Sequence, residues 1–339
     1  MSDNAMEQIV SILRQGGAPW YPERGEMLSV RVVGHTPKSD HYIYDAVMEF
    51  ADGGERLAIK VFRANRCGAQ GVRSLAAQEL RHLQSVHAMA EVKKLTGIPR
   101  PLGDFAELGA IVSEKLTGIP LQSIIMKAAL LPGYAECGTL QFAAKRTGEW
   151  LRKFHRATAD MPEPFDSAAF LADLEKLCAN CKKEGLDDLS IRNIMGGAKA
   201  ILARSRKTLP SSAVLNNFAP LNVVIAEGGV GFCDFARMSK RGSSFHDVAM
   251  FLASVEALEK YPFCDRTITS GVQESFLESY GVSSADQRLL RVLKMKTLLS
   301  MLVQGRTIRE SAMRKKVMWA NVMKRFIQQA AERALAPTG

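Results

Sequence analysis

The sequence of 339 residues is poor in cysteine, and its six cysteines form no spacing framework typical of a disulfide scaffold. Cys178 and Cys181 have the spacing of a zinc or redox pair. They lie in a helical pattern, FLADLEKLCANCKK, with no second pair and no flanking histidine. Zinc binding and redox chemistry are therefore not favoured, and buried thiols in a reducing compartment fit better.

Long hydrophobic runs are also missing. No apolar stretch approaches the roughly 18 residues that predict a membrane span. The first residues, MSDNAMEQIV, lack the basic-then-apolar order of a secretion signal. We therefore expect a cytoplasmic protein with no transmembrane segment.

Charge is unevenly distributed. The formal net charge is +10, and from Arg288 to Arg333 twelve lysines and arginines stand against only Glu310 and Glu332. No known reader motif accompanies them, so nucleic-acid binding is not favoured. A solvated face of C-terminal helices is the simplest interpretation, and peripheral contact with a membrane or glycan surface through this region is kept as a hypothesis.

A β-hairpin is the most informative local pattern. Two short apolar runs, Val223–Ile225 and Val230–Cys233, flank Glu227–Gly229, and such runs split by glycines predict a hairpin. An antiparallel hairpin turning there would set Asn222 beside Asp234 at its open end. An amide oxygen and a carboxylate suit Mg²⁺. A plain surface hairpin with ordinary turn residues is the alternative, and this stretch alone leaves both open.

The N-terminal third predicts an antiparallel meander. Its three predicted strands are Leu28–Val33, Ile43–Phe50 and Leu57–Phe62. The loop between the first two is Gly34–Asp40. A short helix, MEQIVSILRQ, precedes them.

One lysine lies in the third of these strands, LAIKVF, and interrupts an otherwise apolar face. The helix expected over residues 70–93 carries Glu79 on its apolar stripe. An unpaired buried charge is costly, so Lys60 and Glu79 are expected to pair. Lys60 reaching out to water, with Glu79 at the edge of the stripe, is the alternative. The apolar members of the stripe are Val72, Leu75, Ala76, Leu83 and Val86.

Together these segments resemble the protein-kinase-like fold and, within it, the aminoglycoside and choline phosphotransferase group. LAIKVF resembles the strand with the phosphate-orienting lysine, and GIPRPLGDF with AIVSEKLTGIPL resembles the strand and linker that hold adenine. The helix before the family's catalytic loop is resembled by TGEWLRKFHRAT, and the loop itself by LNNFAPLN. The metal-binding strand end is resembled by CDF, and the later helix by HDVAMFLAS. The resemblance covers about residues 28–255 in the correct order.

The resemblance implies an α+β fold with two lobes. Residues 1–115 would form a small N-terminal lobe with an antiparallel sheet and one helix, on the phosphate side. Residues 116–339 would form a large, mostly helical lobe with the catalytic loop and a substrate cleft.

The resemblance also implies roles for individual residues with ATP and Mg²⁺ as cofactors. Lys60 would contact the α/β phosphates, and Glu79 would fix Lys60. Ser39 would offer a hydroxyl to the phosphates, and the backbone near Glu114 and Leu116 would face adenine. The metal ligands would be Asn222 and Asp234, and Asp247 would brace the catalytic loop.

Two features depart from this family. The catalytic aspartate falls on Asn217, and the two neighbouring histidines fall on Leu215 and Ala219. A neutral amide cannot take a proton near pH 7, and a positioned base contributes roughly 10²–10⁴-fold. The loop Gly34–Asp40 has only one glycine, which predicts a weaker phosphate clamp. This pattern fits two kinds of protein. One is an enzyme whose catalytic base comes from elsewhere, and the other is a nucleotide-binding pseudokinase that acts as a scaffold.

The acceptor is expected to be a small molecule with a hydroxyl group. Arg237, Lys240 and Arg241 follow the metal-binding strand end, which suggests an anionic acceptor such as a sugar phosphate, lipid headgroup or lipopolysaccharide core, although a solvated basic loop is the simpler interpretation. Residues 121–210 and 256–339 are expected to be mostly helical, with His155 packing or capping within its helix rather than acting in catalysis. Two apolar stripes there predict core: Met295, Leu298, Leu299 and Leu302, and then Met318, Trp319, Val322 and Phe326.

Overall fold

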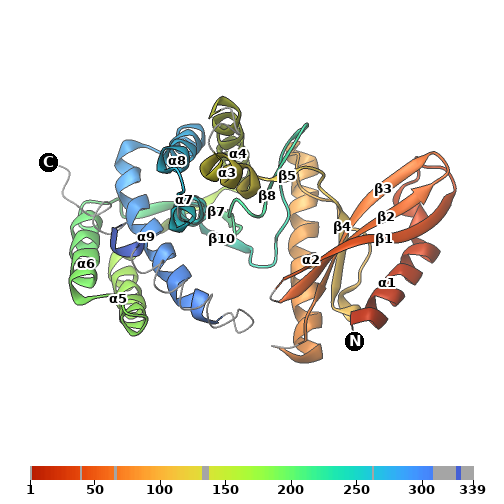
Figure 1. Cartoon of the computed structure of the whole chain (residues 1–339), viewed down its shortest axis with the longest axis horizontal. Coiled ribbons are helices and arrows are strands. Elements are labelled where there is room, and N and C mark those ends of the chain that lie inside the picture. Colours follow the sequence, from red (N-terminus) through yellow and green to blue (C-terminus); the bar gives the residue numbers. More distant parts are fainter. Residues whose placement is uncertain are drawn as a thin grey trace. The chain divides into compact units, whose positions relative to one another are not determined.

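The fold is described from a computed structural model of the chain (Figure 1). Its atoms group into two compact units. The first comprises Met1–Thr117 and Gly231–Met238, and the second comprises Gly118–Val230 and Ser239–Gly339. The structure describes residues 2–38, 40–64, 67–131, 137–261, 263–307 and 326–329.

The first unit is built on a four-stranded antiparallel sheet in the order β1-β2-β3-β4. The predicted meander is confirmed, although its first two strands extend further into the loop between them than expected. That loop is shortened to a turn because pairing continues as far as Pro37 opposite Tyr42. The strands are β1 (Met27–Pro37), β2 (His41–Phe50), β3 (Gly53–Phe62) and β4 (Ala110–Glu114).

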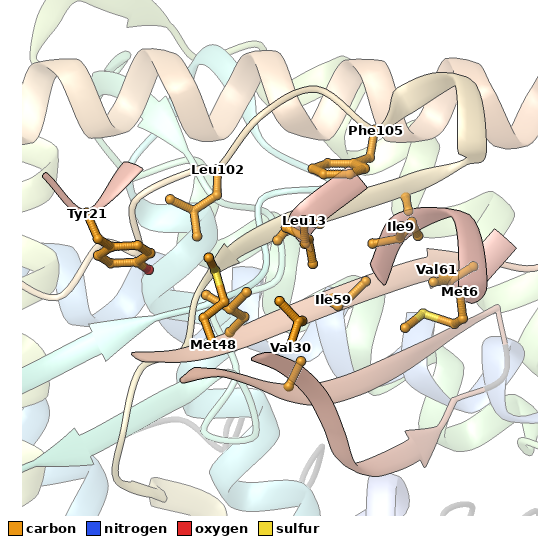
Figure 2. Packing of buried hydrophobic residues seen from close by; sticks show 14 of the residues in the cluster. Met6, Ile9, Leu13, Tyr21, Val30, Met48, Ile59, Val61, Leu102 and Phe105 are labelled. Atoms are coloured by element: carbon orange, nitrogen blue, oxygen red, sulfur yellow. The ribbon is translucent and has the colours of Figure 1, made fainter. Parts of the chain in front are cut away.

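One face of this sheet is covered by helix α1 (Ser2–Gly16). Alternation along β3 sends Leu57, Ile59 and Val61 to this face, where they are buried against Ile9 and Leu13 of the helix (Figure 2). Each such buried aliphatic side chain stabilises the fold by about 1.5–3 kcal/mol. The rest of this core comes from β1, β2, β4 and the loops, including Tyr21, Val30, Met48, Leu102 and Phe105.

The opposite face of β3 carries Lys60, which points toward helix α2 (Gly68–Lys93). The buried stripe of α2 includes four of the predicted apolar residues and Glu79. The prediction for Leu75 was wrong, because this side chain is 42% exposed. Leu80, one helical turn from Ala76, takes the buried position. The helix ends at Lys93, and the left-handed backbone of Lys94 (φ 53°) lets the Leu95 N–H donate to the Ala90 carbonyl at 2.9 Å.

The second unit is mostly helical, as predicted. Its helices are α3 (Leu121–Leu130), α4 (Cys137–Ala157), α5 (Ser167–Lys183), α6 (Asp188–Leu202), α7 (Phe245–Glu256), α8 (Arg266–Tyr280) and α9 (Ser284–Thr307). The predicted stripe from Met295 to Leu302 is buried in α9, which contacts α5, α6 and α7. Of the last predicted stripe, Phe326 is buried, while Met318, Trp319 and Val322 lie outside the described residues.

Two small sheets complete the fold. One has the order β10-β7-β6, and the other has the order β5-β8-β9, which contains the predicted glycine hairpin. The strands are β5 (Ile119–Pro120), β6 (Asp160–Pro164), β7 (Thr208–Val214), β8 (Val223–Ala226), β9 (Gly229–Phe232) and β10 (Ser239–Ser243). Short 3₁₀ turns occur at Ala18–Trp20, Ala106–Leu108 and Ala257–Lys260.

The pair Cys178 and Cys181 is buried in α5. Burial raises the pKa of these thiols to about 11 and about 12, so both stay protonated near neutral pH. Within the described ranges, no cluster of three or more His, Cys, Asp or Glu side chains is arranged to hold a metal ion. Among the helices that the structure describes, none combines the length and apolar character that crossing a bilayer requires.

Candidate active site

The centre of the candidate site in the first unit is the ammonium group of Lys60. Its Nζ lies 2.8 Å from Glu79 Oε2 and 3.1 Å from Glu79 Oε1, so the predicted pair forms. It also lies 3.1 Å from Asp234 Oδ1, a residue 174 positions away in the chain. The structure therefore brings together three of the predicted site residues on one ammonium group.

Burial shapes the electrostatics of this triad. The three side chains of Lys60, Glu79 and Asp234 are 15%, 5% and 21% exposed. Burial alone would lower the pKa of Lys60, but the carboxylates of Glu79 and Asp234 outweigh it and raise the pKa above its usual value. Lys60 is therefore a permanent cation. With both carboxylates ionised the triad carries one net negative charge, which favours a further cation nearby.

The segment that carries Asp234 is held tightly to the first unit. The Phe232 N–H donates to the Gly97 carbonyl at 2.9 Å, and His82 Nδ1 lies 3.1 Å from the Phe235 carbonyl oxygen. A side chain at Gly231 would come within 2.9 Å of the Gly97 carbonyl, so only glycine fits this close approach. These contacts fix the position of Asp234 relative to Lys60.

Two other predicted residues lie where β4 leaves the sheet. The Glu114 N–H donates to the Arg100 carbonyl and the Lys115 N–H donates to the Arg56 carbonyl, both at 2.9 Å. Successive backbone groups of an extended chain point to opposite sides. Strand β4 ends at Glu114, and the same alternation continued beyond it would put the Glu114 carbonyl and the Leu116 N–H on one side, as a donor–acceptor pair for a planar base. Their contact with adenine stays a prediction.

Ser39, the hydroxyl donor predicted for the phosphate-binding loop, lies outside the described residues, so its role stays a prediction.

In the second unit, the segment predicted to form the catalytic loop is held by Asp247. This carboxylate is fully buried, and its oxygens accept the backbone N–H groups of Leu215 and Asn216, both at 2.8 Å. Asn216 has a left-handed backbone (φ 57°), which asparagine tolerates better than most residues. Asp247 therefore makes the bracing contacts that the resemblance implied.

His155 was interpreted as a packing residue, and the structure gives it polar contacts as well. Its Nε2 lies 3.1 Å from Asp247 Oδ2 and its Nδ1 lies 2.9 Å from the Tyr280 hydroxyl. A histidine on the apolar stripe of WLRKFH was the only signal in the sequence. Its partners are 92 and 125 residues away, so local patterns could not identify them.

The loop itself is closed by short-range bonds. The Asn217 carbonyl accepts the Ala219 N–H at 2.8 Å and Asn222 Nδ2 at 3.0 Å. Leu215, in the place of the expected histidine, is fully buried. Asn217 and Asn222 are thus close in the second unit, while Asp234 belongs to the first. The sharing of one metal ion by Asn222 and Asp234 stays a prediction.

The basic residues after Asp234 are exposed, and Arg241 pairs with two carboxylates. Arg241 Nε lies 2.8 Å from Glu163 Oε1 and 3.4 Å from Asp160 Oδ2 of β6. These carboxylates offset its charge, which makes it less suited to an anionic ligand. Contact of Arg237, Lys240 and Arg241 with an acceptor stays a prediction.

Much of the basic C-terminal region, residues 308–325 and 330–339, lies outside the described residues. Two of its described lysines are paired with acids, Lys294 with Glu256 and Lys296 with Asp173.

No family model matches the chain, and no curated sequence matches it. Solved structures do match over nearly the whole chain. A spectinomycin phosphotransferase in complex with ADP and spectinomycin has a TM-score of 0.55 and 9% identity, covering 97% of this chain and 98% of that one. A glucosamine kinase has a TM-score of 0.54 and 16% identity, covering 89% and 94%.

A choline kinase from Streptococcus pneumoniae has a TM-score of 0.51 and 14% identity, covering 98% of this chain and 99% of that one. At such identities the likeness establishes the fold. These structures are phosphotransferases of protein-kinase-like fold, so the predicted fold is confirmed.

Proposed function

We propose that this chain of protein-kinase-like fold binds ATP with Mg²⁺ and descends from small-molecule O-phosphotransferases. The observation that carries the proposal is the triad of Lys60, Glu79 and Asp234. A buried ammonium group held between two carboxylates from distant parts of the chain costs desolvation energy, and a nucleotide-binding role explains why that cost is tolerated.

In this proposal each residue of the first unit has one task. Lys60 binds the α/β phosphates, and Glu79 holds the ammonium in place. The Glu114 carbonyl and Leu116 N–H bind the adenine edge. Asp234 supplies a carboxylate to Mg²⁺, with Asn222 as a second oxygen donor. These hard oxygen donors suit Mg²⁺, which when bound neutralises phosphate charge.

Transfer to an acceptor would form a bond between the acceptor oxygen and the γ-phosphorus and break the bond to the β-phosphate oxygen, releasing ADP. The acceptor hydroxyl must also lose its proton. Asn217 can orient that hydroxyl but cannot accept the proton. Because phosphoryl transfer depends mainly on positioning and electrostatics, the missing base slows transfer without abolishing it.

A catalytically silent pseudokinase is the second candidate. The observation that favours it is the pair of replacements in one loop, Asn217 at the position of the base and the buried, apolar Leu215 two residues earlier. In that case the nucleotide would stabilise a scaffold, and no acceptor would be consumed.

The acceptor in the first candidate is a small molecule with a hydroxyl group. The similar structures are named for spectinomycin, glucosamine and choline, which are small polar molecules. The exposed Arg237 and Lys240 favour an acceptor with a negative charge.

Replacing Lys60 with alanine is expected to weaken ATP binding by about 10- to 100-fold. The reason is the loss of charge-assisted hydrogen bonds to phosphate, worth about 1.5–3 kcal/mol. Isothermal titration of the full-length chain with ATP and Mg²⁺ measures this change.

Lys93→Ala is the matched control, because Lys93 is an exposed lysine in the last turn of α2 of the same unit. It should bind ATP as the parent does. Circular dichroism and the melting temperature show whether Lys60→Ala is folded, and Glu79→Gln gives a second variant of the same pair. ATP affinity unchanged in a folded Lys60→Ala protein would remove the phosphate role from this lysine.

A further inference from the structure

Helix α1 has a second side that the core of the first unit does not use. Ile9 and Leu13 are buried against the sheet, whereas the neighbouring side of the helix lines an open groove with a volume of about 460 Å³. Val32 of β1 lines the same groove and is 43% exposed. The other residues that line it all lie on α1: Met6, Glu7, Val10, Ser11, Arg14 and Gln15.

Strand β1 forms an edge of the four-stranded sheet, because β2 is its single partner among the described strands. Val30 and Val32 point to the α1 side of the sheet, since side chains alternate along a strand. Val30 is buried in the cluster that contains Ile9, but Val32, two residues further along, is not covered. With the half-buried Val10, it gives the groove an apolar surface that a partner would remove from water.

Two oppositely charged side chains of α1 also line the groove. Glu7 and Arg14 are seven residues apart, so they lie on the same side of the helix and about 10 Å apart along its axis. Both are exposed. Arg14 is held beside the strand, because its Nη2 donates to the Val30 carbonyl at 3.2 Å. Within the described residues neither side chain forms an ion pair, so both charges are available to a partner.

The order of these charges is complementary to itself. In two antiparallel α1 helices related by a twofold axis between Val10 and Ser11, residues at equal distances from the axis lie opposite each other. Glu7 of each helix then faces Arg14 of the other, and the ion pair occurs twice. A parallel pair would set Glu7 against Glu7 and Arg14 against Arg14. The groove therefore fits a second copy of this chain in one orientation.

We propose that the groove beside α1 binds a second copy of this chain, with the two α1 helices antiparallel and two ion pairs between Glu7 and Arg14 across the twofold axis. The partner's helix would also cover Val10 and Val32. One helix from each chain buries less area than a standard interface, so we expect a dimer that forms at micromolar concentrations. Because Lys60 lies on the opposite face of the sheet, this interface is separate from the proposed nucleotide site.

Reversing one charge is expected to weaken the dimer at least about tenfold, because like charges then meet at both ends of the contact. This holds for Glu7→Arg and for Arg14→Glu. The two variants change the net charge in opposite directions, so a general charge effect would not weaken both. The double variant Glu7→Arg/Arg14→Glu restores opposite charges and should return the dissociation constant to within about threefold of the parent value.

Sedimentation equilibrium of the full-length chain, from low to high micromolar concentration, measures these dissociation constants. The control is Arg81→Glu, which reverses the charge of an exposed arginine of α2 in the same unit and should leave the dimer unchanged. Circular dichroism and the melting temperature show whether each variant is folded.

The expected pattern is a dimeric parent, two weakened single variants and a restored double variant. A parent that stays monomeric over the whole concentration range would overturn the proposal. A dimer that persists in both single variants would also overturn it, because the interface would then lie elsewhere. The same conclusion would follow from a folded double variant that associates as weakly as the single variants, or from an equal loss in Arg81→Glu.

Discussion

Asp247→Ala is expected to lower the free energy of unfolding of the second unit by about 3–5 kcal/mol, the range for removing one partner of a buried charged network. The carboxylate is fully buried and accepts the N–H groups of Leu215 and Asn216 as well as a contact from His155. Alanine would leave these donors without an acceptor in a place that water does not reach, at about 1–3 kcal/mol for each buried unsatisfied group. Urea denaturation followed by circular dichroism measures the loss.

Asp166→Ala is the matched control for this variant. Asp166 also accepts two backbone N–H groups, those of Ala168 and Ala169, both at 2.9 Å, and it belongs to the same unit. It is exposed at the start of α5, so water can replace it, and the expected loss is about 1 kcal/mol. Similar losses for the two variants would mean that Asp247 does not hold the loop as described.

Asn217→Asp is expected to raise the rate of phosphoryl transfer, by up to the roughly 10²–10⁴-fold that a positioned base contributes. The change replaces one side-chain nitrogen with oxygen and creates a group that can accept the acceptor's proton. The measurement is ADP release from ATP and Mg²⁺ at pH 7, with water alone and with a panel of aminosugars, amino alcohols and phosphorylated sugars.

Asn193→Asp serves as the control because it makes the same chemical change at an exposed position of α6 in the same unit. It should leave the rate as it was. An unchanged or lower rate in Asn217→Asp would mean that the base, where one is used, lies elsewhere. A rate that rises only in Asn217→Asp would show that the remaining site is still competent for transfer.

The sequence was enough to predict the local elements and to identify charged residues that lie among apolar ones. Strand alternation located Lys60 on an apolar strand, and the cost of a buried charge was enough to name Glu79 as its partner. The same reasoning could not find that Asp234 is the third member, because that contact joins residues 174 positions apart. Hydrophobic periodicity also placed Leu75 on the buried stripe of α2, although this leucine is exposed and Leu80 is buried instead.

The strands of the β10-β7-β6 sheet show a second limit. β6 (DMPEP) and β10 (SKRGS) are short and polar, without the alternation that marks a strand. They form because β7 offers a partner on each side, and the pairing is supported by Arg241 with Glu163 and Asp160. Such strands depend on tertiary contacts that no local pattern records.

The most direct test of the central claim is the melting temperature of the full-length chain with ATP, with and without Mg²⁺. A ligand at 100 times its dissociation constant stabilises the folded state by about 2.7 kcal/mol, which corresponds to a shift of several degrees. We predict such a rise with ATP, a larger one when Mg²⁺ is added, and a much smaller one in Lys60→Ala. A melting temperature that saturating ATP and Mg²⁺ leave unchanged would contradict the account.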